Sequence, residues 1–377
     1  MKKLIIIFYL ISISQILSQS QIELNGYLQN MQTVWAPKQF DNWIFSNSIS
    51  NRINFHYYPS SNITFNLGLR NIYDYGQLVQ MFPDYDKLVT ADNGLVNLTK
   101  KISSNTSSVL YSNIDRLNLF FSFENFEIQI GRQRVNLGIN YVWTPNDIFN
   151  SFSFLNFDYL EKSGSDAVRF QYHFDYASSL QLIAKADENK NMTFAGVIKF
   201  NKWNYDFQSI AGFSDEDYIF GGGWTGDILG AGFSGEATYF NSRENIDDIF
   251  VASIGGNYTF SNSLFLMAEF LYNSIGSDKK NIQTSNLFDL EYSAKLLSPA
   301  KYSFFFSGQY PITPLLNSSL ATIINPIDGS FFINPSLDFS LNEDVYLLIS
   351  GQVFIGNDLT EWGEYGKFYY LRLKWNF

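Results

Sequence analysis

Residues 48–70 read SISNRINFHYYPSSNITFNLGLR, and apolar and polar side chains alternate on both sides of a short turn. Before the turn, Ile49, Ile53 and Phe55 share one face, and Arg52 shares the other with its polar neighbours. An alternation of period two predicts β-strands, and the Pro-Ser-Ser-Asn turn between them predicts a hairpin.

The same alternation recurs along almost the whole chain after residue 21. Aromatic residues make up 18% of the 377 residues, and no apolar run is long enough for a transmembrane helix, which needs about 20 residues. A transmembrane β-strand needs only about 9–11 residues, with alternate side chains facing lipid. The sequence therefore predicts an all-β fold, a transmembrane antiparallel β-barrel.

The connections between the predicted strands alternate in length. Short links are expected at 59–61, 123–125, 174–177, 200–202, 226–228, 261–262, 311–313 and 342–344, and long links at 74–108, 138–164, 274–299 and 356–366. Short periplasmic turns and long extracellular loops are typical of bacterial outer-membrane barrels, and this segmentation gives about eighteen strands. A secreted β-sandwich or β-helix remains the alternative, but a sandwich of this length needs two domains, and no linker is visible.

The N-terminus has the composition of a secretory signal. Lys2 and Lys3 precede a mostly apolar run from Leu4 to Leu17, and small residues follow, so we expect a signal peptide at 1–20 and one barrel domain at 21–377. Removing the signal leaves 23 basic residues against 36 acidic ones, a net charge of −13. Such an acidic chain is a poor partner for nucleic acid. The sequence has no cysteine and only two histidines, so we expect no metal site and no cofactor.

The last predicted strand ends on an aromatic residue. Its apolar positions alternate up to the final residue, and this pattern resembles the signal by which outer-membrane barrels are recognised for insertion; the residues are Tyr369, Leu371, Leu373, Trp375 and Phe377. The expected partners are therefore the barrel-assembly machinery, outer-membrane lipid and lipopolysaccharide, in a bacterial outer membrane.

The arginines gather on one part of the predicted wall. A charge facing lipid at the membrane midplane costs about 2–4 kcal/mol, so charged residues on strands must point inward. The arginines expected to line the lumen are Arg52, Arg70, Arg116, Arg132, Arg134, Arg169 and Arg372. Inward acidic residues are expected across the barrel, so the lumen would have a basic wall and an acidic wall; they are Asp206, Glu236, Glu269 and Asp338. Alternatively, the arginines fill the lumen and hold loops through carboxylate pairs.

The stretch GRQRVNLGINYVWTPNDIF at 131–149 breaks the pattern. Phe126, Ile128 and Ile130 define a lipid face, which in strict register would turn Arg132 and Arg134 outward. A β-bulge at Gly131–Arg132 would exchange the faces and point both arginines into the lumen. Alternatively, the strand leaves the membrane at Gly131.

The long link 138–164 is unusually aromatic for a loop in water. We expect it to fold into the barrel, where Asp147 or Asp158 would pair with arginines and complete a constriction. Binding of a partner at the cell surface is the competing use of this loop.

The motifs GRQRVNLG, WTPNDIFN and FDYLEKSGSDAVRFQY resemble those of porin-like outer-membrane barrels of Bacteroidota. Leu137 and Thr144 depart from the usual Trp and Asn of that pattern, and the core motif is distantly similar to alginate-export barrels. The resemblance implies passage of polar or anionic solutes and does not identify the solute.

The favoured function is a passive outer-membrane porin for small hydrophilic solutes, with some preference for anions. The alternatives are an acidic-glycan export barrel and a plugged structural or surface-binding barrel. An enzyme is not expected, because neither His56 nor His173 has a nucleophile in its neighbourhood. A homo-oligomer is possible, since the outward aromatic residues would suit lipid or a second subunit equally.

Overall fold

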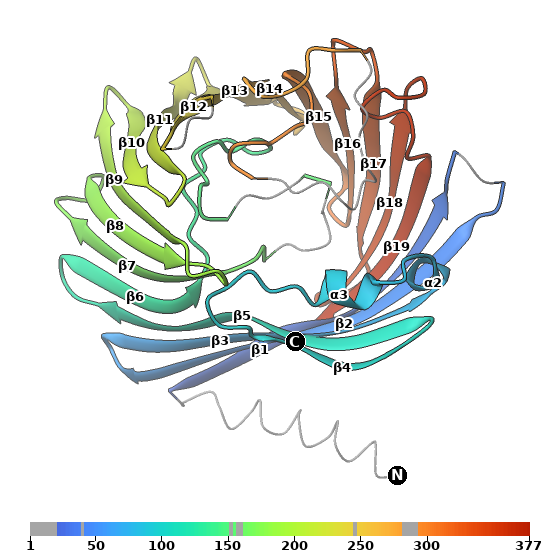
Figure 1. Ribbon diagram of the computed structural model, residues 1–377, viewed down its shortest axis with the longest axis horizontal. Coiled ribbons are helices and arrows are strands. Elements are labelled where there is room, and N and C mark those ends of the chain that lie inside the picture. Colours follow the sequence, from blue (N-terminus) through green and yellow to red (C-terminus); the bar gives the residue numbers. More distant parts are fainter. Residues whose placement is uncertain (1–20, 39–40, 151–153, 156–160, 244–246, 281–292) are drawn as a thin grey trace.

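The computed structural model describes residues 21–38, 41–150, 154–155, 161–243, 247–280 and 293–377, so the predicted signal peptide and Asp158 lie outside the described residues. Eighteen antiparallel strands close into a barrel, because β1 pairs with both β2 and β19 (Figure 1). The barrel strands are β1 (Ile22–Ala36), β2 (Ile44–Ser60), β3 (Ile63–Gly76), β5 (Ser108–Ser122), β6 (Phe126–Gln133), β7 (Ser165–His173), β8 (Ser179–Ala186), β9 (Met192–Lys202), β10 (Tyr205–Phe213), β11 (Asp217–Ile228), β12 (Ala231–Ser242), β13 (Ile249–Thr259), β14 (Phe265–Asn273), β15 (Tyr302–Thr313), β16 (Leu316–Ile324), β17 (Phe331–Ser340), β18 (Val345–Ile355) and β19 (Lys367–Asn376).

One further strand and two short helices belong to the first long loop. Strand β4 (Thr99–Asn105) pairs with the first half of β5, and β6 pairs with the second half of β5 on the same side. Helices α2 (Gln77–Met81) and α3 (Tyr85–Val89) precede β4. The fold class predicted from the alternation, a barrel of about eighteen strands, is confirmed.

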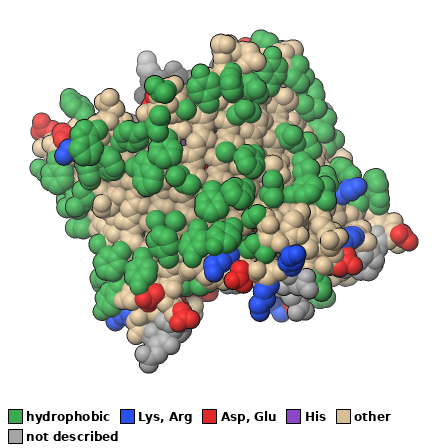
Figure 2. All heavy atoms as spheres, turned by 90° about the horizontal axis from the view of Figure 1, so that it is seen from above, with side chains coloured by type: hydrophobic (Ala, Val, Ile, Leu, Met, Phe, Trp, Pro, Cys, Tyr) green, Lys and Arg blue, Asp and Glu red, His purple; other side chains and the backbone are tan. Residues whose placement is uncertain are grey.

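The outer surface of the barrel is apolar. On β19 the exposed side chains are those of the predicted insertion pattern, Tyr369, Leu371, Leu373, Trp375 and Phe377, each exposed over 41% to 48% of its surface. Apolar side chains are spread over the whole face in Figure 2, and the charged side chains seen there lie mainly toward its margins. Such a surface is stable only in lipid, so the barrel spans a membrane with its strands. No helix within the described ranges is long and apolar enough to cross a membrane.

Strand β6 changes faces at Gly131. Ile130 is 46% exposed, whereas Arg132, which strict alternation places on the same outer face, is 4% exposed and points inward. The pairing of β6 with β5 and β7 continues through this point without an inserted residue, so the predicted bulge at Gly131–Arg132 is wrong. Instead Gly131 has a φ of 115°, which re-orients the backbone and turns Arg132 inward.

The irregularity lies on the neighbouring strand. In the pairing of β3 with β5, Gly68 faces Arg116 and Leu69 faces Ile114, so Asp115 is an extra residue in β5. Because of this bulge, the adjacent residues Asp115 and Arg116 both make their contacts inside the barrel.

Replacing Gly131 with Ala is expected to destabilise the barrel by about 1–3 kcal/mol, because a Cβ at this φ is strained. The added Cβ would also lie 2.3 Å from the carbonyl oxygen of Leu117. The matched control is Gly196→Ala, whose Cβ would meet its nearest atom at an ordinary 3.6 Å. Urea unfolding of the refolded barrels measures both; equal stabilities would contradict the assigned role of Gly131.

Candidate constriction in the barrel

The segment 134–150 folds into the barrel and crosses to the far wall (Figure 1). It is held there by two glutamates that point inward from β12 and β14. The carboxylate of Glu236 accepts the backbone N–H groups of Ile139, Asn140 and Asn146 at 2.9, 2.8 and 3.0 Å. That of Glu269 accepts those of residues 141, 142 and 143 at 3.3, 3.0 and 2.7 Å.

These six contacts give the two glutamates a role that the alternation did not suggest. Glu236 is 1% exposed and Glu269 is 4% exposed, because the segment covers both carboxylates. Buried carboxylates are costly unless hydrogen bonds compensate their charge, and the backbone N–H groups do so here. The carboxylates therefore act as anchors for the inward segment, and the acidic wall expected from the sequence is covered at these two positions.

The WTPNDIF part of the segment is its most buried stretch. Asn146 is fully buried. The hydroxyl of Thr238 donates to the side-chain oxygen of Asn146 at 2.7 Å and to the carbonyl oxygen of Pro145 at 2.9 Å. The Asn146 amide in turn donates to the carbonyl of Gly222 at 3.1 Å. Phe149, 3% exposed, packs with apolar residues of the 135–137 stretch and of β7 to β10.

Apolar side chains on the inner face of β13 to β19 receive the other side of the segment. Trp143 packs in a buried cluster with Val251, Leu271 and Phe305, and the rings of Trp143 and Phe305 meet edge to face at 6.5 Å. The sequence signal for this surface is a loss of alternation at the loop ends of these strands, as in the run Phe304-Phe305-Phe306. Strands that are apolar on both faces are usually buried on both faces. Here the outer face lies in lipid, and the inner face lies under the inward segment.

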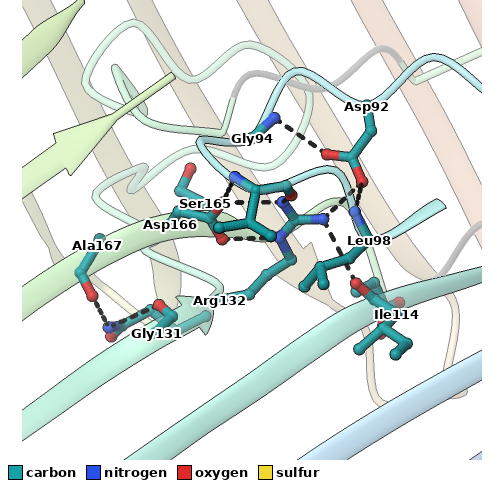
Figure 3. Close-up of polar contacts among 12 residues, drawn as sticks. Asp92, Gly94, Leu98, Ile114, Gly131, Arg132, Ser165, Asp166 and Ala167 are labelled. Carbon is teal, nitrogen blue, oxygen red and sulfur yellow. Dashed lines mark hydrogen bonds and ion pairs between the residues drawn. The ribbon is translucent and has the colours of Figure 1, made fainter. Parts of the chain in front are cut away.

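Arg132 ties the first long loop to the wall (Figure 3). Its Nε and Nη2 donate to the two carboxylate oxygens of Asp166 at 2.8 and 2.9 Å, and its Nη1 donates to Asp92 at 2.8 Å. Nη2 also donates to the carbonyl of Val96 at 2.6 Å. Burial disfavours ionisation of Asp92, but the hydrogen bonds from Arg132 and from the backbone of Gly94 and Leu98 hold the pKa of this carboxyl below its usual range.

A second arginine group holds the end of the inward link. Arg52 forms a buried bidentate pair with Asp115, at 2.6 and 2.9 Å. Arg116 donates to the backbone carbonyls of Glu161 and Lys162 at 2.5 and 3.0 Å. The carboxylate of Glu161 accepts the hydroxyl of Tyr27 at 3.2 Å. These contacts fasten residues 161–162 to β1, β2 and β5.

The remaining predicted arginines are half-buried and lie on strands or loops of the same part of the wall. Arg169 donates to Gln129 at 3.0 Å, and Arg372 lies near Asp338. Arg70 lies near Tyr27, and Arg134 lies near Asp147. The carboxylate of Asp147 accepts the N–H of Leu137 at 3.5 Å. The structure thus brings Arg52, Arg116 and Arg132 into clusters that hold loops.

The sequence matches no model of a protein family, and no curated protein is significantly similar to it. Solved structures do match. OprD, an outer membrane protein of Pseudomonas aeruginosa, aligns with a TM-score of 0.61 and 9% identity over 95% of this chain and 94% of that one. OccAB1 of Acinetobacter baumannii gives 0.59 and 10% over 95% and 98%. A Rhodopseudomonas blastica porin mutant gives 0.50 and 13% over 94% and 100%. The fold of this chain is therefore that of bacterial outer-membrane porins.

Proposed function

We propose that this protein is a channel of the bacterial outer membrane for passive diffusion of small hydrophilic solutes, with a preference for anions. The observation that carries the proposal is the segment 134–150, which is anchored across the inside of a closed barrel. A segment held in this way narrows the lumen, and charged residues beside a constriction select among permeating ions.

The charge balance at the inner surface favours anions. Glu236 and Glu269 are covered by backbone N–H groups, so their charges are compensated. Arg70, Arg169 and Arg372 remain half-buried on the inner face of β3, β7 and β19. Because the field in a low-dielectric channel depends on which charges reach the water, we expect the arginine side to outweigh the two covered glutamates.

The localisation signals follow from the same proposal. We propose that residues 1–20 direct secretion and that the outward pattern ending at Phe377 is read by the barrel-assembly machinery. Outer-membrane lipid and lipopolysaccharide would then surround the apolar exterior, or a second copy of the chain would cover part of it. The motif resemblance to Bacteroidota porins is consistent with this placement.

Planar lipid bilayers test the channel. The purified protein is expected to produce steady, ohmic openings in potassium chloride, and an equal amount of heat-denatured protein serves as the control. A folded protein that stays electrically silent would instead support a plugged structural or surface-binding barrel. Passage of an acidic oligosaccharide through the open barrel would support the export alternative.

A further inference from the structure

A cavity of about 580 Å³ lies inside the barrel at its short-turn end, beneath the inward segment. Gly138 and Ile139 of that segment line it on one side, and residues of β7 to β11 line the rest. Its volume is within the usual range of sites for small organic ligands, about 300–1,000 Å³. The turn 174–178 borders it, so it faces the side of the barrel where the connections are short.

The polar side chains of this cavity come from neighbouring positions of the barrel wall. In the strand register, His173 faces Ser179, Ser179 faces Lys199, and Lys199 faces Gln208. Two residues before Gln208 on β10, and closer to the turn between β9 and β10, Asp206 faces Thr225 of β11. The cavity thus has a cation and a carboxylate on adjacent strands, with neutral hydrogen-bonding groups around them.

The cation is available to a solute. Lys199 is half-buried, and its ammonium group makes no hydrogen bond or ion pair with a described residue. The charges of Arg169, which has the same sign, and of Asp206 act on it. A half-buried lysine beside an arginine binds an oxyanion well, because the anion offsets both the repulsion and the loss of hydration.

The carboxylate and the neutral groups suit hydroxyl groups. Asp206 accepts the amide of Asn201 at 2.8 Å through one oxygen, and no hydrogen bond from a described residue reaches the other. Thr225 and Gln171 add a hydroxyl and an amide to the lining. The carboxylate can only accept hydrogen bonds, so it favours a solute that donates them and repels a second anionic group.

We propose that this cavity is a solute subsite that binds an oxyanion carried on a hydroxylated body, such as a sugar acid or a sugar phosphate. Lys199 holds the oxyanion, and Asp206 with Thr225 accepts and donates hydrogen bonds to the hydroxyl groups. The proposal rests on the proposed channel function, because it places the subsite on the route of a permeating solute. It would make the short-turn side of the channel the side of higher affinity.

Isothermal titration calorimetry on the detergent-solubilised full barrel tests the subsite with three probes of equal carbon chain: gluconate, hexanoate and sorbitol. Gluconate is expected to bind more tightly than hexanoate, which lacks the hydroxyl groups, and than sorbitol, which lacks the charge. Lys199→Met should weaken gluconate roughly tenfold to a hundredfold, the loss expected for a charge-assisted hydrogen bond. Glucose 6-phosphate, titrated in parallel, distinguishes phosphate from carboxylate as the preferred oxyanion.

Matched variants separate the site from the fold. Lys202→Met removes the same charge at the end of β9, outside the cavity lining, and should leave gluconate binding unchanged. Lys199→Arg keeps the cation and should retain most of the affinity for gluconate. A change in gel mobility on heating shows that each variant is folded before the measurement.

The outcomes distinguish this proposal from the channel itself. Gluconate binding that survives Lys199→Met, or that equals hexanoate binding, overturns the subsite even if the protein conducts. A protein that binds gluconate through Lys199 but stays silent in bilayers retains the subsite and loses the channel.

Discussion

Replacing both Glu236 and Glu269 with Gln is expected to raise the single-channel conductance severalfold and to make the current noisy. Each carboxylate accepts three backbone N–H groups of the inward segment. Hydrogen bonds to a charged group are worth about 1.5–3 kcal/mol each. A glutamine has one acceptor oxygen, and its NH₂ group would face N–H donors, so the segment loses its attachment to β12 and β14.

The control for this prediction is Asp338→Asn, which also removes an inward carboxylate. Asp338 lies on β17 and makes no hydrogen bond to the described part of the inward segment. Its conductance should remain close to that of the wild type. Quiet traces of wild-type conductance from the folded double variant would show that the segment is held by its apolar packing alone.

Replacing Arg132 with Met is expected to cost about 3–5 kcal/mol of stability, because it leaves two largely buried carboxylates without their cation. Asp92 and Asp166 would then repel each other, and the loop residues around Val96 would detach from β6. Urea unfolding followed by tryptophan fluorescence measures the loss. Limited proteolysis should cut the 92–98 stretch in the variant and spare it in the wild type.

A matched set of variants separates the charge of Arg132 from its size. Arg169→Met removes an inward arginine that donates one hydrogen bond, to Gln129, and should cost far less. Adding Asp92→Asn and Asp166→Asn to Arg132→Met removes the unpaired charges and should recover part of the lost stability. If Arg132→Met proves as stable as Arg169→Met, the ion-pair cluster has no stabilising role.

The barrel could be predicted from the sequence because its two solvents impose a period of two. Lipid outside requires residues such as Ile130 and Leu371 on one face, and the opposite face then follows by parity. The same rule predicts that Arg52 and Arg116 point inward, and both make their contacts there. Strict alternation would place the charge of Arg132 in lipid, so the sequence also predicts that Arg132 points inward, as it does. The mechanism at Gly131 was missed, since a glycine φ and an inserted residue have the same effect on parity.

The partners of these charges could not be predicted, because they depend on contacts between distant parts of the chain. Asp115 has the parity of a lipid-facing residue, and only the bulge in β5 brings it to Arg52. Asp92 lies in a loop without any periodicity, yet it reaches Arg132. The alternation predicts that Glu236 points inward, but its hydrogen-bond donors are backbone N–H groups, which no sequence pattern indicates.

The surface on which the inward segment packs can be recognised in the sequence. The strands from β13 onward lose their alternation at the loop end, where Phe305 and Phe332 are fully buried between outward apolar neighbours. Inner residues of a water-filled barrel should be polar, so apolar residues there indicate that another part of the chain covers them. Counting inward apolar positions near strand ends would therefore have located the site where the segment 134–150 packs.

Anion selectivity is tested most directly by the reversal potential of the wild-type channel under a potassium chloride gradient across a planar bilayer. Chloride should cross faster than potassium, so the dilute side should be negative at zero current. Neutralising Arg70, Arg169 and Arg372 together should reduce this potential. A positive dilute side would show that uncovered carboxylates dominate the lumen, and it would contradict an anion-selective constriction in which Glu236 and Glu269 are covered.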